Sequence, residues 1–321
     1  MWLASKIYGL IIHCRNWLYD KGVLKSYKAV LPTICIGNLA VGGTGKTPHT
    51  EHFARLLTNS GYKVAILSRG YRRKTKGFRI VDANSTAAEV GDEPLQMYKK
   101  TGVIVAVCKD RLQGVRILKD TFPDLQLVLL DDAMQYRRLI PSLTIMLTAA
   151  DNLYTADKML PLGRLRDEKQ SVKRANMVIV SNVCDNLPQT DNINNRVFFS
   201  KIRYENLRPL LSMSVPDHIS KPLIVTGIAQ PKSMIEYLRN EYKQVKVLKF
   251  ADHRTFNSSD YKKIFGYNAD YIITTEKDSM RLSSSDCPKD LLSKTFVLPI
   301  SVECDEADKF LLERVSELFS N

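Results

Sequence analysis

The chain has 321 residues, of which 44% are hydrophobic and 25% are charged, and this ordinary globular composition allows about two domains. Its formal net charge of +13 favours an anionic partner, such as nucleic acid, nucleotide phosphates or an acidic membrane surface. Six scattered cysteines without a CxxC pair argue against a zinc site or a disulfide framework and suit a reducing cytosol. We expect no secretory signal and no membrane span, because Lys6, His13 and Arg15 bound the longest early apolar run, Ile7–Ile12, and a span needs about 20 apolar residues.

Residues 1–28 are predicted to contain an amphipathic helix. Apolar side chains recur there at helical spacing, and lysine and arginine side chains surround the apolar stripe. Such a helix can lie in a membrane interface, with Trp17 and Tyr19 at the level of the headgroups. It can equally dock its stripe on the protein's own core, and the pattern alone does not decide between the two.

Residues 29–215 read as an α/β domain of the P-loop NTPase type. Short apolar runs alternate with helical segments, which predicts a mostly parallel sheet with helices on both faces. The first helix is expected from about Thr47 to Leu57. The predicted strands are Thr33–Gly37, Lys63–Ser68, Val103–Val107, Leu125–Leu130, Leu143–Leu147 and Met177–Val180.

Residues 216–321 repeat the alternation and are predicted to form a second, smaller α/β domain. The polar stretch Asp185–Asn195 reads as a loop that could mark the boundary. The predicted helices are Ser233–Arg239 and Asp305–Phe319. The predicted strands are Leu223–Thr226, Val245–Phe250, Tyr271–Thr275 and Phe296–Leu298.

A glycine-rich loop lies between the first predicted strand and the first helix, which is the context of a Walker A motif. Glycines let backbone N–H groups face phosphate oxygens, while Lys46 reaches the β and γ phosphates of ATP and Thr47 offers its hydroxyl to Mg²⁺. Ala40 stands where the usual motif begins with glycine. The expected nucleotide-binding residues are Ala40, Val41, Gly42, Gly43, Thr44, Gly45, Lys46 and Thr47.

Asp131 and Asp132 follow an apolar strand and suit a Walker B role, in which they hold Mg²⁺ directly or through water. Ligands of open α/β sheets bind at the carboxyl ends of the strands, so this pair should lie beside the P-loop. The expected metal site therefore comprises Thr47, Asp131 and Asp132. A solvated turn after a core strand is the alternative.

Other polar clusters offer groups for the acceptor. Asp92 could take a hydroxyl proton and Glu93 could bind sugar hydroxyls, although their spacing alone favours simple capping of a helix start. His253, preceded by Asp252, could serve as a base or an orienting group. Arg111 and Arg166 lie in basic clusters that could hold phosphate.

Taken together, these segments resemble the tetraacyldisaccharide 4′-kinase family of lipid A biosynthesis. The resemblance runs nearly from end to end, and it is the order and spacing of the motifs that make it specific. The matching segments are residues 8–12, 15–20, 36–48, 67–71, 90–94, 131–135, 160–166, 226–229, 252–253 and 274–278.

The resemblance implies transfer of the γ-phosphate of ATP to the 4′-hydroxyl of a tetraacyldisaccharide 1-phosphate, which gives lipid IVA. It also implies a peripheral enzyme on the cytoplasmic face of a Gram-negative inner membrane, which favours the interfacial role of the first helix. In this family, Asp92 matches the catalytic base and His253 matches its assisting histidine. Glu93 and Arg166 match positions that contact the acceptor, and Arg111 matches a cation near the transferring phosphate.

Three positions depart from the family pattern, namely Ala133, Tyr136 and Arg254. Two other functions compete with the kinase. A GTPase-like switch is suggested by residues 181–185, which loosely echo a guanine-reading loop but lack its lysine. A nucleic-acid binder is suggested only by the charge, and no nucleic-acid motif is present. We expect no nucleic-acid partner and no obligate protein partner.

Overall fold

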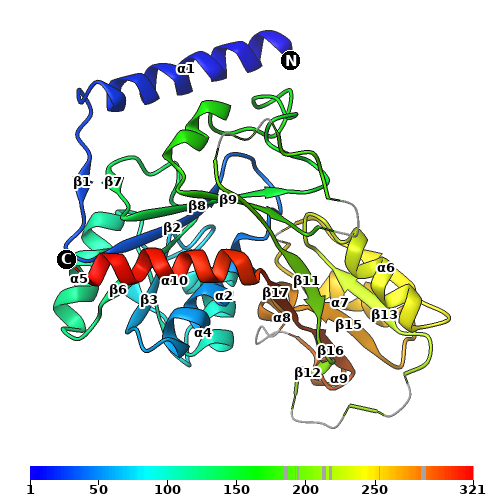
Figure 1. Cartoon of the computed structure of the whole chain (residues 1–321). Helices are drawn as coiled ribbons and strands as arrows, with labels where there is room; N and C mark the ends of the chain where they lie inside the picture. Colours follow the sequence, from blue (N-terminus) through cyan, green and yellow to red (C-terminus); the bar gives the residue numbers. More distant parts are fainter. Residues whose placement is uncertain are drawn as a thin grey trace.

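The computed structural model describes residues 1–183, 187–191, 193, 195–211, 215–216, 219–252, 254–282 and 287–320. Figure 1 shows two α/β units, with the amino-terminal helix along the outside of the larger one. His253 lies outside the described residues, as does part of the predicted boundary loop Asp185–Asn195.

The larger unit is built on an eight-stranded sheet in the order β10-β9-β8-β2-β6-β3-β5-β4. Neighbouring strands are parallel except β4, which pairs antiparallel with β5 at the edge. The strands are β2 (Thr33–Asn38), β3 (Val64–Ser68), β4 (Arg79–Ile80), β5 (Ile104–Val107), β6 (Leu127–Asp131), β8 (Leu143–Ala149), β9 (Met177–Ser181) and β10 (Val197–Phe199). The six predicted strands of this unit are confirmed, with ends that differ by one or two residues.

Helices cover both faces of this sheet, as predicted. Successive side chains of β2 point to opposite faces, so Ile34 and Ile36 enter one core while Cys35 enters the other. One face is covered by α2 (Lys46–Asn59), α4 (Asp92–Thr101) and α10 (Asp305–Phe319). The other is covered by α5 (Arg111–Thr121) and the 3₁₀ helix η1 (Lys169–Arg174), and the short helix α3 (Ala87–Val90) precedes α4.

The smaller unit has a five-stranded sheet in the order β12-β16-β15-β13-β14, in which only the β12–β16 pair is antiparallel. Its strands are β12 (Arg208–Pro209), β13 (Leu223–Thr226), β14 (Lys246–Lys249), β15 (Ile272–Thr275) and β16 (Thr295–Leu298). Its helices are α6 (Lys232–Glu241), α7 (Ser258–Phe265), α8 (Glu276–Leu282) and α9 (Lys289–Ser293).

The last helix departs from the expected domain division. We expected residues 216–321 to form one unit, but Ala307, Leu311 and Val315 of α10 are buried in the core of the first sheet. The chain returns there through β17 (Ile300–Glu303), which pairs antiparallel with β11 (Lys201–Tyr204) between the two units (Figure 1). The apolar stripe of α10 matches a helix-covered face of the larger sheet, and sequence periodicity does not specify which sheet a helix will cover.

The amino-terminal helix α1 (Trp2–Asp20) turns its apolar stripe outward. Leu3, Ile7 and Leu10 are 65%, 53% and 62% exposed, whereas its buried residues include the polar Ser5 and Asn16. The helix is held to the larger unit through polar bonds, one of them from Ser5 Oγ to the carbonyl of Met159 at 2.9 Å. The stripe therefore does not dock on the protein's own core. Among the described residues, no helix is both long and apolar enough to cross a bilayer.

Two short strands complete the link between α1 and the first sheet. β1 (Tyr27–Lys28) pairs in parallel with β7 (Leu139–Ile140).

Candidate active site

The glycine-rich loop connects β2 to α2 at the edge where the carboxyl ends of the parallel strands meet. Gly42 and Gly45 have φ angles of 106° and 77°, which residues with a Cβ atom rarely adopt. Gly45 immediately precedes α2. Ala40 has no such angle and instead forms a β-bridge with Leu165, so the alanine does not distort the start of the loop.

Three polar side chains, Asn38, Ser181 and His49, bind the loop through hydrogen bonds. Asn38 Nδ2 donates to Thr44 Oγ1 at 2.7 Å, and Ser181 Oγ donates to the Thr44 carbonyl at 3.0 Å. The His49 ring lies 2.7 Å from the Gly45 carbonyl through Nδ1 and 2.8 Å from Ser200 Oγ through Nε2. Burial lowers the pKa of His49 to about 4, so the imidazole is neutral at physiological pH.

Sequence reasoning did not identify His49 or Ser200 as part of the site. His49 lies in the first turn of α2, four residues after Gly45, and this closeness to the P-loop was the available signal. Its partner Ser200 lies 151 residues away and is identified only by the fold. Part of the GTPase-like segment, residues 184–185, lies outside the described residues, and Ser181 supports the loop.

Asp131 and Asp132 lie beside the loop, as the topology predicted. Asp131 is buried and accepts a hydrogen bond from Ser68 Oγ at 2.8 Å. Burial, together with the nearby carboxylates of Glu93 and Asp132, raises the pKa of Asp131. Burial also opposes ionisation of Asp132, but the adjacent Lys46 and Arg166 outweigh it and hold its pKa at about 2.

The predicted cations lie on the same wall. Lys46 Nζ is 4.0 Å from Asp132 Oδ1, and the Arg166 guanidinium pairs with both oxygens of that carboxylate. Arg111 is buried, donates to the Lys109 carbonyl at 2.8 Å and lies over the Tyr136 ring, 5.5 Å from its centroid. Its Nε has no hydrogen-bond partner among the described residues.

The start of α4 faces the smaller unit. Asp92 is buried, and its Oδ2 lies 3.7 Å from Arg281 Nε on α8. Lys277 Nζ, also on α8, lies 2.9 Å from Glu93 Oε1 and 3.8 Å from Asp252 Oδ1. Lys277 therefore lies between Glu93 of α4 and Asp252, the neighbour of His253 in the chain.

The departures from the family pattern have local explanations. The Tyr136 hydroxyl donates to Asp110 Oδ1 at 2.7 Å, and Ala133 is buried in the core beneath. Arg254 pairs with Asp260 at 2.9 Å, within the smaller unit.

A cavity of about 950 Å³ joins the P-loop, the carboxylate pair and the contact between α4 and α8. It is lined by residues 40–48, by Glu93, Asp131 and Asp132, and by Lys277 from the smaller unit. Tyr8, Ile12 and Arg15 of α1 also line it, so one face of that helix borders the cavity. Asp92 is not among the lining residues, whereas its neighbour Glu93 is.

Comparisons with known proteins identify the family of this chain. The family model for tetraacyldisaccharide-1-P 4′-kinase, LpxK, matches residues 1–317. Tetraacyldisaccharide 4′-kinase of Flavobacterium johnsoniae is 42% identical, and the alignment covers 92% of this chain and 89% of the relative. The enzyme of the same name from Parabacteroides distasonis is 38% identical, with 97% and 92% covered.

A solved structure supports the same assignment. The crystal structure of LpxK from Aquifex aeolicus in complex with ATP matches with a TM-score of 0.77 and 28% identity, covering 97% of this chain and 96% of that one. The chain therefore belongs to the tetraacyldisaccharide-1-P 4′-kinase family.

Proposed function

We propose how the residues of this chain perform the reaction of its family. The chain is a kinase of lipid A biosynthesis, and it transfers a phosphoryl group from ATP to the 4′-hydroxyl of a tetraacyldisaccharide 1-phosphate. The observation that carries the mechanism is the single cavity in which the P-loop, the carboxylate pair and the α4–α8 contact meet.

ATP binds with its phosphates in the P-loop. Backbone N–H groups of residues 42–47 face the phosphate oxygens, and the start of α2 adds a partial positive charge. Lys46 then exchanges its contact with Asp132 for the β and γ phosphates, because a phosphate carries more negative charge than one carboxylate. Arg111 offsets the charge of the γ-phosphoryl group, and its unpartnered Nε supplies a donor for it.

Mg²⁺ fits the oxygen ligands at the end of β6. Asp131 is a buried carboxylate whose pKa is raised, so a divalent cation would offset an unfavourable buried charge. Asp131, Asp132 and the Thr47 hydroxyl would hold the ion, and these oxygen ligands suit Mg²⁺. Bound there, Mg²⁺ would neutralise charge on the phosphates.

The acceptor hydroxyl is deprotonated at α4. Asp92 acts as the base, assisted by His253 as the family resemblance implies, while Glu93 and Arg166 contact the sugar. Arg281 and Lys277 of α8 balance the charge of these carboxylates before the acceptor binds. Because Asp92 belongs to the larger unit and Asp252, which precedes His253 in the chain, belongs to the smaller one, closure of the two units would bring the base to its assisting residue and exclude water.

The amino-terminal helix places the enzyme at its lipid substrate. The outward stripe of α1 is an apolar face that acyl chains can cover, and the basic residues around it suit acidic headgroups. Because Tyr8 and Ile12 of the same helix line the cavity, an acylated substrate can pass from the membrane surface to the P-loop. We therefore place the enzyme peripherally at the cytoplasmic face of the inner membrane.

Acceptor dependence tests this function. ATP turnover is measured with the tetraacyldisaccharide 1-phosphate, without an acceptor, and with a 4′-deoxy analogue that has no hydroxyl to phosphorylate. A kinase turns ATP over rapidly only with the intact acceptor. Equal turnover under all three conditions would contradict phosphoryl transfer to this hydroxyl and would favour the switch-like reading.

A further inference from the structure

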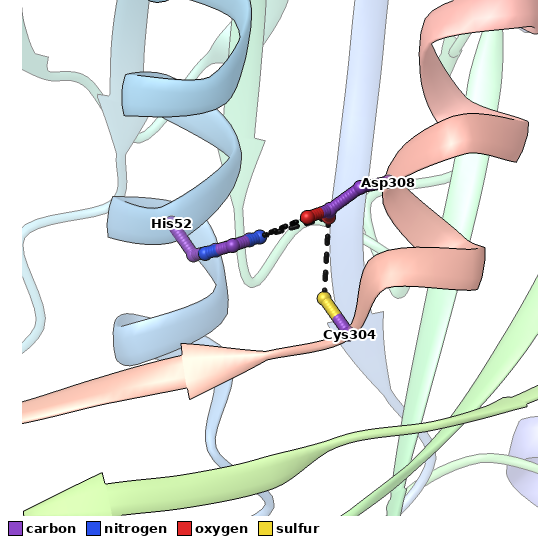
Figure 2. A group of neighbouring side chains, drawn as sticks. All are labelled: His52, Cys304 and Asp308. Carbon is purple, nitrogen blue, oxygen red and sulfur yellow. Dashed lines mark hydrogen bonds and ion pairs between the residues drawn. The ribbon is translucent and has the colours of Figure 1, made fainter.

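A histidine, a cysteine and an aspartate meet between α2 and α10, outside the active-site cavity (Figure 2). His52 lies on α2, Asp308 on the first turns of α10, and Cys304 immediately before α10. His52 Nε2 is 2.8 Å from Asp308 Oδ1 and 2.9 Å from Oδ2, and Cys304 Sγ is 3.3 Å from Oδ1. The cavity is not lined by any of the three.

These three side chains offer the ligand atoms that zinc prefers, namely an imidazole nitrogen, a thiolate and a carboxylate oxygen. One potential ligand atom from each side chain lies within 4.8 Å of the others. Zinc bonds of about 2.0–2.3 Å separate tetrahedral ligand atoms by roughly 3.3–3.8 Å. A single ion therefore needs only small side-chain shifts to reach all three.

The surroundings suit a bound ion. Cys304 is 4% exposed, whereas the side chains of His52 and Asp308 are 17% and 15% exposed, so water can reach a fourth coordination position. The edge of the His52 ring meets Phe53 at a centroid distance of 5.3 Å, which restrains the imidazole. A divalent ion with one thiolate, one carboxylate and a neutral imidazole has no net charge, which lowers the cost of partial burial.

We propose that His52, Cys304 and Asp308 bind a single zinc-like divalent metal ion, with water as the fourth ligand. The ion replaces the thiol proton of Cys304, which leaves to solvent, and binds Nε2 of a neutral His52 ring that carries its proton on Nδ1. It joins the start of α10 to α2, the helix that begins at Lys46 of the P-loop. Its role is thus to fix the carboxyl-terminal helix against the nucleotide-binding helix.

Without metal, the same geometry is a hydrogen-bonded triad in which Asp308 accepts from both neighbours. Sequence reasoning argued against zinc because the cysteines are scattered. Only the return of the chain through β17 brings Cys304 to a histidine that is distant in the sequence. The two readings differ in whether a metal can displace the protons, and this difference can be measured.

The test is a cobalt titration of the metal-free full-length protein, without an affinity tag and with excess Mg²⁺ to occupy oxygen-ligand sites. We expect one equivalent of Co²⁺ to give a thiolate-to-cobalt charge-transfer band and the visible bands of a tetrahedral ion, and Zn²⁺ to abolish both. Zn²⁺ should also raise the melting temperature.

The matched variants are Cys304→Ser, which removes the thiolate, and Cys14→Ser, which changes an exposed cysteine elsewhere. The bands and the zinc-induced shift should be lost in the first variant and kept in the second. His52→Gln, which retains a hydrogen-bonding side chain, should weaken cobalt binding and serves if Cys304→Ser does not fold. No charge-transfer band in the wild type, or an unchanged band in Cys304→Ser or His52→Gln, would establish the hydrogen-bonded triad and overturn the metal site.

Discussion

Replacing Lys100 by methionine should strongly destabilise the protein. The Lys100 side chain is 8% exposed, and its Nζ lies 3.0 Å from Glu51 Oε2 and 2.6 Å from Glu276 Oε2. It also donates to the carbonyl of Ile300 at 2.7 Å. Methionine keeps the length of the side chain but leaves two carboxylates without their shared cation. Breaking a buried ion pair on one side costs about 3–5 kcal/mol of the free energy of unfolding.

The loss should depend on pH through Glu51. Burial, opposed by Lys100, raises the pKa of Glu51 from 4.5 to about 7. The folded state therefore holds this proton more tightly than the unfolded state. The resulting stability is fully present below pH 4.5 and is lost as pH rises through about 7, at a cost of about 3 kcal/mol. Without Lys100 the pKa rises further, so the variant should lose more stability at about pH 8 than at about pH 5.

The assay is denaturant unfolding of wild type and Lys100→Met at both pH values. Glu51→Gln is the matched control, because it removes the titrating carboxylate while keeping a side chain that can hydrogen-bond Gln96. It should flatten the pH dependence, and the double variant should lose less than the two single losses combined. A loss below about 1 kcal/mol, or one that is equal at both pH values, would refute this reasoning.

Three further predictions concern the active site and the membrane. Asp92→Asn should lower kcat roughly 10²–10⁴-fold at a temperature where the variant is still folded, and an unchanged kcat would remove Asp92 as the base. His49→Ala leaves the Gly45 carbonyl and Ser200 without their partner, so we expect the KM for ATP to rise about tenfold or more while the acceptor KM is unchanged. A rise in both would indicate a general loss of structure. Ile7→Glu with Ile11→Glu should weaken vesicle flotation at least about tenfold, whereas the control pair Ile140→Glu with Phe265→Glu, on exposed sites elsewhere, should not. Equal binding by both pairs would contradict the interfacial role of α1.

Much of the larger unit could be predicted because its strands are short apolar runs buried on both faces. Such runs are easily recognised in the sequence, and the observed strands Thr33–Asn38 and Met177–Ser181 are each only one residue longer than the predicted ones. The short strands β11 and β17 were not predicted, because each has only four residues, most of them partly or fully exposed, and so leaves little pattern. The placement of α10 depends on the pairing of β17 with β11, and sequence periodicity cannot show which of two sheets a helix covers.

The residues of the candidate site also fall into those that the sequence predicted and those that only the fold brings together. The P-loop and Asp131 were found because a local motif brings their chemistry together within a few residues. Arg166 was expected at the acceptor, and its pairing with Asp132 beside Lys46 follows only from the three-dimensional arrangement. The contacts of Lys277 and Arg281 with the α4 carboxylates also required the fold, because they join segments nearly 200 residues apart.

Phosphoryl transfer to the lipid can be followed with labelled ATP. Purified protein is incubated with γ-labelled ATP, Mg²⁺ and a tetraacyldisaccharide 1-phosphate in detergent, beside a Lys46→Ala control. We predict that label enters the lipid with the wild type and not with the variant, and that it is found at the 4′ position. ATP hydrolysis that leaves the lipid unlabelled would contradict the account, because the P-loop would then serve a different acceptor.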